Sequence, residues 1–220
     1  MNGSNRKGLG RLLWGLVVMW FLVVFAAGSM GVFDGGGRYS MRLPLPLGLA
    51  AVLPVVVFGV WFSVSTPFRE HLLSLNPVIL TAVQTWRVGG IAFLILMAKG
   101  VLPAFFALPA GLGDMAIGVT APLVALALAR NKLPAGRLIL WQASGIADLV
   151  VAVTMGVLCS PTPIGILAYG TTTRVMGQLP MSLIPTFAVP LLVILHIICI
   201  AQARESRRTS PVLRAASANA

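Results

Sequence analysis

The sequence is dominated by uninterrupted apolar blocks about 20 residues long, with almost no charged residue inside them. A helix of that length crosses roughly 30 Å of hydrocarbon, whereas a transmembrane barrel needs strands of about ten residues with alternating polarity. Hydrophobic residues make up 58% and charged residues 10% of the chain, against about 25% charged residues in a soluble domain. The pattern therefore predicts an all-α, polytopic transmembrane helix bundle and excludes a soluble fold.

Six spans account for the apolar blocks, and they form a single transmembrane domain at residues 12–203. A basic head precedes this domain at residues 1–11, and a disordered basic tail follows it at residues 204–220. The predicted spans lie at about residues 12–33, 45–65, 77–98, 103/110–129, 138–158 and 181–203.

Three features of this division have alternatives. The fourth span begins either at Pro103 or just after Pro109, so residues 101–109 are part of the helix or an interfacial or re-entrant lead. Residues 160–179 contain two prolines and three consecutive threonines, and are too polar for another crossing, although they can dip into the interface. The first span is a membrane anchor or a cleaved signal peptide, and cleavage would leave five spans.

The distribution of basic residues predicts the orientation. Eleven Lys and Arg residues lie in the two ends and the loops on their side, and four lie in the loops on the other side. By the positive-inside rule both termini are cytoplasmic, in the plasma (inner) membrane if the organism is bacterial. Basic residues that flank spans can also bind anionic lipid headgroups, so the net charge of +11 needs no nucleic-acid partner.

Three ionisable residues fall inside the predicted spans: Arg87, Asp114 and Asp148. Each costs roughly 2.5 to 3.5 kcal/mol at the centre of a span, so each needs a polar partner inside the bundle. Arg87 and Asp148 lie about ten residues into their spans, and Asp114 reaches a similar depth if its span begins at Pro103. We therefore expect the three side chains to meet near the membrane midplane.

Further polar residues share the faces of these helices. Gln84 lies three residues before Arg87 and Gln142 lies six before Asp148, so helical spacing directs each pair to one side. His196 lies in the cytoplasmic half of the sixth span, where it serves either packing or proton relay. His71 lies in a loop, so a bis-histidine haem is not expected, and neither a metal site nor any other cofactor is predicted.

The fourth and fifth spans resemble each other. Residues 111–120 align with residues 145–154 at an offset of 34, with Gly, Asp, Val and Thr identical. Successive spans run in opposite directions, so the two segments form an inverted pair, which transporters with a midplane site use. Chance similarity between two helices rich in Gly and Val explains the alignment equally well.

The ionisable cluster predicts a proton- or cation-coupled small-molecule transporter or permease rather than an enzyme. Two carboxylates beside one arginine in a medium of low dielectric cannot all ionise cheaply, so one aspartate pairs with Arg87 and the other takes a proton or a cation. The structural alternative is a sealed Arg–Asp bond with the second aspartate held by Gln142 or Gln84. A non-catalytic membrane subunit or scaffold is a further possibility, and the oligomeric state is not predicted.

Residues 111–114 read Gly-Leu-Gly-Asp and resemble the Gly-x-Gly-Asp motif of intramembrane aspartyl proteases. The resemblance implies catalysis by two aspartates that share a proton, with Asp148 as the second carboxylate. The sequence departs from that family in two respects, because the second Asp follows the motif instead of preceding it and no Pro-Ala-Leu element follows. A protease of this kind requires the two aspartates to face each other without Arg87 between them.

Overall fold

A computed structural model describes the backbone of residues 3–34 and 45–218, and the side chains of residues 8–34 and 45–208. Within these ranges the chain is all-helical and contains no β-strand. The described part contains six helical segments that are long and apolar enough to cross a membrane, which confirms this part of the prediction. These segments are Gly8–Ser29, Leu45–Val64, Pro77–Ala98, Ala104–Ala129, Ala135–Leu158 and Ile184–Arg208.

Several segments are built from more than one helical element. The elements in chain order are α1 (Gly3–Ser29), α2 (Leu45–Val64), α3 (Thr66–Leu73), α4 (Pro77–Val83), η1 (Gln84–Gly90), α5 (Ile91–Ala98), α6 (Ala104–Ala129), α7 (Ala135–Leu158), η2 (Thr173–Gly177), η3 (Ile184–Ala188) and α8 (Val189–Ala218). The short helix α3 connects the second and third spans, and the Ser65 side chain caps it by accepting a hydrogen bond from the Phe68 N–H.

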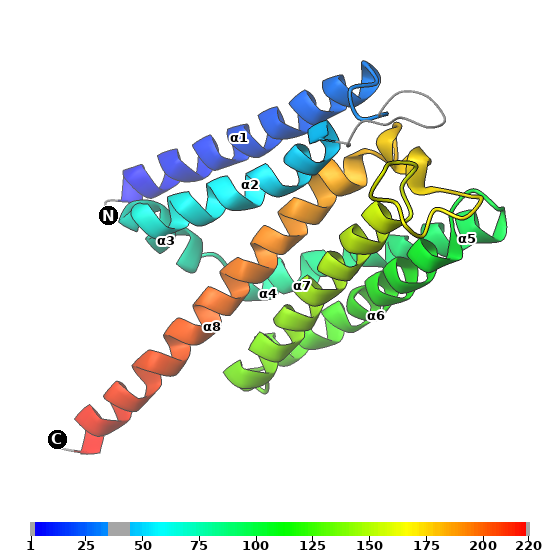
Figure 1. Ribbon diagram of the computed structural model, residues 1–220. Coiled ribbons are helices and arrows are strands. Elements are labelled where there is room, and N and C mark those ends of the chain that lie inside the picture. Colours follow the sequence, from blue (N-terminus) through cyan, green and yellow to red (C-terminus); the bar gives the residue numbers. More distant parts are fainter. Residues whose placement is uncertain (1–2, 35–44, 219–220) are drawn as a thin grey trace.

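The helices are arranged around α8, which contacts α2 on one side and α7 on the other (Figure 1). Helix α6 packs against α7 and against the whole third span, from α4 through η1 to α5. The start of α1 and the end of α8 lie toward the same end of the molecule, while the segment between α7 and α8 lies at the opposite end (Figure 1). The third, fourth, fifth and sixth spans therefore surround a common interior.

The distribution of side chains is the reverse of that in a water-soluble bundle. Large aliphatic residues such as Leu49, Val52 and Val60 are exposed on α2, and the other spans show similar outward-facing residues. The most deeply buried large side chains include His196 and Gln142, both fully inaccessible. Apolar residues on the outside and polar residues on the inside are suited to a lipid environment, where polar groups must find partners within the protein.

The third span was predicted as one helix, but the structure divides it into α4, η1 and α5. Its central turn, η1, is a 3-10 helix of seven residues that ends in the glycine pair Gly89–Gly90. Glycines lower the preference for α-helix, and a 3-10 turn has 3.0 residues per turn, so residues three apart lie directly above one another. Gln84, Arg87 and Gly90 follow this spacing and are all buried. The tight winding thus turns one row of residues toward the interior.

The first residue of the fourth span agrees with only one of the two predicted starts. Helix α6 is continuous from Ala104 to Ala129, with Pro103 as its N-cap and Pro109 inside it. A start after Pro109 was therefore wrong, and residues 104–109 belong to the helix rather than to a separate lead. Proline inside a membrane helix is tolerated where neighbouring helices and side chains satisfy the freed backbone carbonyl. Residues 160–179 contain turns and the short helix η2, without another crossing.

The first and last helices of the chain are also longer than predicted. Helix α1 begins at Gly3 rather than near residue 12, and α8 continues to Ala218 where a disordered tail was expected from residue 204. Residues 201–210 contain neither glycine nor proline, so nothing in this segment ends the helix where the apolar block ends. The basic tail therefore continues α8 beyond the predicted end of the sixth span at residue 203.

Candidate functional site

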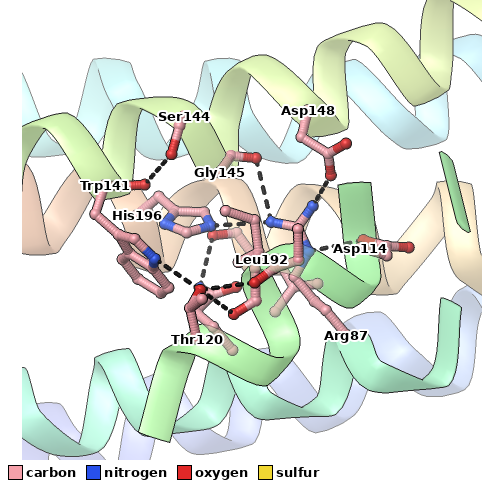
Figure 2. Close-up of polar contacts among 12 residues, drawn as sticks. Arg87, Asp114, Thr120, Trp141, Ser144, Gly145, Asp148, Leu192 and His196 are labelled. Atoms are coloured by element: carbon pink, nitrogen blue, oxygen red, sulfur yellow. Dashed lines mark hydrogen bonds and ion pairs between the residues drawn. The ribbon is translucent and has the colours of Figure 1, made fainter. Parts of the chain in front are cut away.

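The guanidinium of Arg87 is the centre of a polar network inside the bundle (Figure 2). Arg87 lies on η1 and its side chain is 1% exposed. Its Nε donates to Asp114 Oδ1 at 2.7 Å, and its Nη2 donates to Asp148 Oδ2. Its Nη1 donates to the Gly145 carbonyl oxygen at 3.2 Å and faces His196 Nε2 at 3.3 Å. All three guanidinium nitrogens are therefore engaged, and Arg87 contacts α6, α7 and α8 through them.

Small residues allow the helices to approach closely enough for these contacts. A Cβ at Gly90 would overlap Asp114, and a Cβ at Gly113 would overlap the Asp148 carboxylate. In the sequence, Gly113 appeared only as part of the internal similarity, and Gly90 had no assigned role. In the structure each of these two glycines leaves space for a carboxylate side chain from the neighbouring helix.

The contacts of His196 determine which ring nitrogen carries a proton. Arg87 has only donors, so His196 Nε2 must accept, and the Nδ1 proton then donates to the Gln142 side-chain oxygen. The Gln142 amide nitrogen in turn donates to Thr81 Oγ1 at 3.2 Å. The imidazole is therefore neutral with its proton on Nδ1, and it continues the network from Arg87 through Gln142 to Thr81.

Five of the six predicted site residues meet in this network: Arg87, Asp114, Asp148, Gln142 and His196. The sixth, Gln84, lies in the same buried row as Arg87 but donates to the Leu192 carbonyl at 3.5 Å instead of binding an ionic residue. Both aspartates bind Arg87, so neither is held by Gln142 or Gln84 as the structural alternative required. The contact between His196 and Arg87 was not predicted, because the two residues are 109 positions apart.

Asp114 also lines a cavity of about 140 Å³. The cavity reaches from Asp114 to the end of the bundle where α1 ends and α7 meets the segment before η2. Its walls are mainly aliphatic and aromatic, and they include Leu47, Phe93, Phe106, Leu149, Val153, Val157 and Met176. Neither Arg87 nor Asp148 lines it, so Asp114 is the member of the ionic triad that joins the buried network to the cavity.

A salt bridge lies at the far end of the same cavity. Arg174 Nε is 3.4 Å from Asp34 Oδ1, and Gln178 Nε2 donates to the same oxygen at 3.1 Å. Both ionic side chains are about one third exposed. No sequence signal pointed to this pair, since the two residues are 140 positions apart and neither the segment after α1 nor the short helix η2 carries a recognisable motif.

The geometry differs from that required for an aspartyl protease. Arg87 binds both carboxylates, Asp114 through Nε and Asp148 through Nη2 (Figure 2). A catalytic pair of aspartates must share a proton directly, which a cation bound to both of them opposes. Within the described residues, no group of three or more His, Cys, Asp and Glu side chains gathers as metal ligands would.

Comparison with known proteins places this architecture in a family. A family model described as a domain of unknown function, DUF8737, matches residues 44–204, which include α2 through the apolar part of α8 and all residues of the Arg87 network. No curated protein and no solved structure matches the chain. Because the family model covers more than half of the 220 residues, the chain belongs to the DUF8737 family of domains of unknown function.

Proposed function

We propose that this protein is a proton- or cation-coupled small-molecule transporter whose site is the triad Arg87, Asp114 and Asp148. One observation carries the proposal: the Asp114 carboxylate binds the buried guanidinium and also lines a cavity that extends to one end of the bundle. A purely structural ion pair needs no such access. Ionisable residues inside membrane spans typically mark ion or substrate pathways.

The charges of the triad support a site that binds and releases a cation. One guanidinium neutralises only one carboxylate, so the ionised triad carries one excess negative charge in a medium of low dielectric. A proton or another cation bound to either aspartate removes that excess. The two carboxylates are 15–16% exposed while Arg87 is 1% exposed, so the aspartates are the members that can exchange ions.

The helical elements around the triad suit a change of shape. Arg87 lies on a 3-10 turn between two α-helices, and such turns in the middle of a helix are frequent at hinges. On the cavity side, α8 is preceded by the π-helical turn η3, which is a second irregular element. Neutralisation of one aspartate would weaken its bond to Arg87 and allow the third span to move relative to the span that carries that aspartate.

We also propose that both termini lie in the cytoplasm and that the cavity opens on the opposite side. An even number of crossings would leave the two ends on one side. Eleven of the fifteen Lys and Arg residues outside the predicted spans belong to the ends and the loops of that side, which supports this orientation. Their charge suits contact with anionic lipid headgroups. In a bacterium the protein would lie in the plasma (inner) membrane.

Proton uptake by the purified protein tests this proposal without knowledge of the substrate. The protein in detergent is moved from mildly alkaline to mildly acidic pH, and the protons taken up are counted with a pH-sensitive dye. We expect Asp114→Asn and Asp148→Asn each to take up about one proton fewer than the wild type, because either change removes the excess charge of the triad. Ser144→Ala, one turn from Asp148 on the exposed side of α7, is the uncharged control.

The result also distinguishes a structural role from an exchanging one. If wild type and both Asn variants take up equal numbers of protons while remaining folded and monodisperse, the triad does not titrate and the transport proposal fails. If added Na⁺ or K⁺ reduces uptake by the wild type at fixed pH, the site exchanges a metal cation for a proton.

A further inference from the structure

The cavity beside Asp114 has two chemically different parts. Its length is lined by apolar side chains from several helices, including Phe93, Phe106 and Leu149. Its inner end carries the Asp114 carboxylate, and its outer end carries Asp34 and Arg174, which are paired with each other. The charge that is not balanced by a neighbour therefore lies at the inner end, on the triad.

Asp114 keeps one acceptor available at that end. Oδ1 accepts the Arg87 Nε hydrogen bond, while no hydrogen bond to Oδ2 is found among the described residues. The second carboxylate oxygen points away from the guanidinium (Figure 2). A carboxylate oxygen at the end of an apolar cavity is an acceptor for a strong donor, and a cationic donor would also balance the excess negative charge.

We propose that the cavity binds a small hydrophobic ammonium ion, with its N–H group on Asp114 and its aryl or short alkyl body between the apolar walls. This inference rests on the proposed transport function and names its substrate class. A dry apolar cavity of roughly 150 Å³ holds benzene, so a cavity of about 140 Å³ suits a single ring or a short chain. A whole lipid or peptide exceeds that volume.

The same geometry disfavours other ligand charges. An anion would add negative charge beside two carboxylates and a single guanidinium, and Arg87 cannot bind it because Arg87 does not line the cavity. A neutral apolar molecule would fill the walls but could not take the place of the proton that the triad releases. The ammonium class is therefore the one that satisfies both parts of the cavity.

Binding of the ammonium ion releases a proton from the triad. In the empty state the triad holds one proton on an aspartate, and the arriving cation displaces that proton, so one positive charge enters and one leaves. The titratable groups around Asp114 are Arg87, Asp148 and, across the guanidinium, His196. Asp34 and Arg174 face the outer end. The exchange couples amine movement to a proton gradient without a change in the net charge of the site.

Binding of three molecules of one shape tests the inference. The full chain is placed in nanodiscs of zwitterionic lipid, with empty nanodiscs as the blank, and equilibrium binding of benzylammonium, benzyl alcohol and benzoate is measured near neutral pH. A charged hydrogen bond predicts benzylammonium to bind about 10- to 100-fold more tightly than benzyl alcohol. Equal binding of benzylammonium and benzyl alcohol, or tighter binding of benzoate, would overturn the inference.

Two variants separate the ionic end from the apolar walls. Asp114→Asn should abolish the preference for benzylammonium over the alcohol. Gly156→Leu should weaken both ligands, since a Cβ at Gly156 already contacts the Phe106 ring at 3.5 Å and a longer side chain would fill the space beside it. Val150→Leu, on the exposed face of α7, is the matched control and should bind as the wild type does. If Gly156→Leu binds as tightly as that control, the ligand lies outside the cavity.

The binding and proton-uptake experiments can fail separately, and each failure has its own meaning. A protein that takes up the extra proton but shows no preference for the ammonium ion keeps the titrating triad and has another substrate. A protein whose Asn variants take up as many protons as the wild type has no exchanging site. For the wild type, release of one proton on binding benzylammonium would support both proposals together.

Discussion

The carboxylate of Asp148 lies directly against Gly113 on the neighbouring helix, where a Cβ would overlap it. Asp114, one residue along that helix, has the same relation to Gly90 on the third span. Each aspartate therefore reaches Arg87 across a helix contact that only glycine permits. The ionic network and the close packing of α6 depend on the same two positions.

We expect Gly113→Ala to destabilise the protein by about 1–3 kcal/mol. The added methyl must displace Asp148 or separate α6 from α7, and overpacking of this kind typically costs that amount. Unfolding in detergent measures the effect. Gly59→Ala on α2 is the control because a Cβ there contacts no other atom within 4 Å. Equal stability of the two variants would mean that Asp148 does not need the space above Gly113.

Charge balance in the triad predicts a non-additive set of variants. Arg87→Leu should cost about 3–5 kcal/mol, because it leaves two carboxylates without a cation in the interior. The triple variant Arg87→Leu, Asp114→Asn, Asp148→Asn should be more stable than Arg87→Leu alone, since no charge remains. Unfolding free energies of the two proteins provide the comparison. If the triple variant is instead less stable than Arg87→Leu, the carboxylates are stabilised by groups other than Arg87.

The spans were predictable from the sequence because their signal is additive over about 20 residues. Each of the six apolar blocks corresponds to a helix able to cross a membrane. The 3-10 turn was not predictable, since over the seven residues of η1 a repeat of 3.0 cannot be distinguished from one of 3.6. The continuity of α6 through Pro109 depends on neighbouring helices, which a local proline rule does not include.

The sequence was largely sufficient to predict which residues form the site, but not how they are arranged. Charged residues in hydrocarbon need partners, so Arg87, Asp114 and Asp148 were expected to meet, and the structure brings them together. The position of His196 beside Arg87 and the cavity next to Asp114 depend on how α8 and η3 pack, which is a tertiary property. The pair Asp34–Arg174 had no sequence signal at all.

The hydrogen bonds of His196 predict its tautomer. The ring should carry its proton on Nδ1 at neutral pH, because Nε2 accepts from Arg87 and Nδ1 donates to Gln142. Nitrogen NMR of protein labelled at histidine distinguishes the two tautomers by their shifts. The chain has two histidines, so His71→Gln removes the other signal and assigns the remaining one. A His196 signal with the proton on Nε2 would contradict the network.

Gln142→Leu is the companion variant for this measurement. It removes the acceptor of the Nδ1 proton without touching the ionic triad. We expect a mixed or altered His196 tautomer signal and a loss of stability of about 1–3 kcal/mol, the usual cost of leaving a buried polar group unpaired. An unchanged signal would show that Arg87 alone orients the imidazole.

Access of water to the cavity predicts a difference between two faces of α7. Val157 lines the cavity, whereas Val150 is 57% exposed on the outer surface of the helix, where lipid would lie. After replacement of both buried native cysteines by alanine, we expect Val157→Cys to react with a membrane-impermeant thiol reagent and Val150→Cys to remain unmodified. A thiol reacts as its thiolate, which water supports and hydrocarbon does not. Benzylammonium should slow the reaction at residue 157, because both occupy the same space. Equal modification of the two cysteines would show that water reaches the cavity no better than the outer face of α7. Protection that persists in Asp114→Asn would show that Asp114 does not hold the amine.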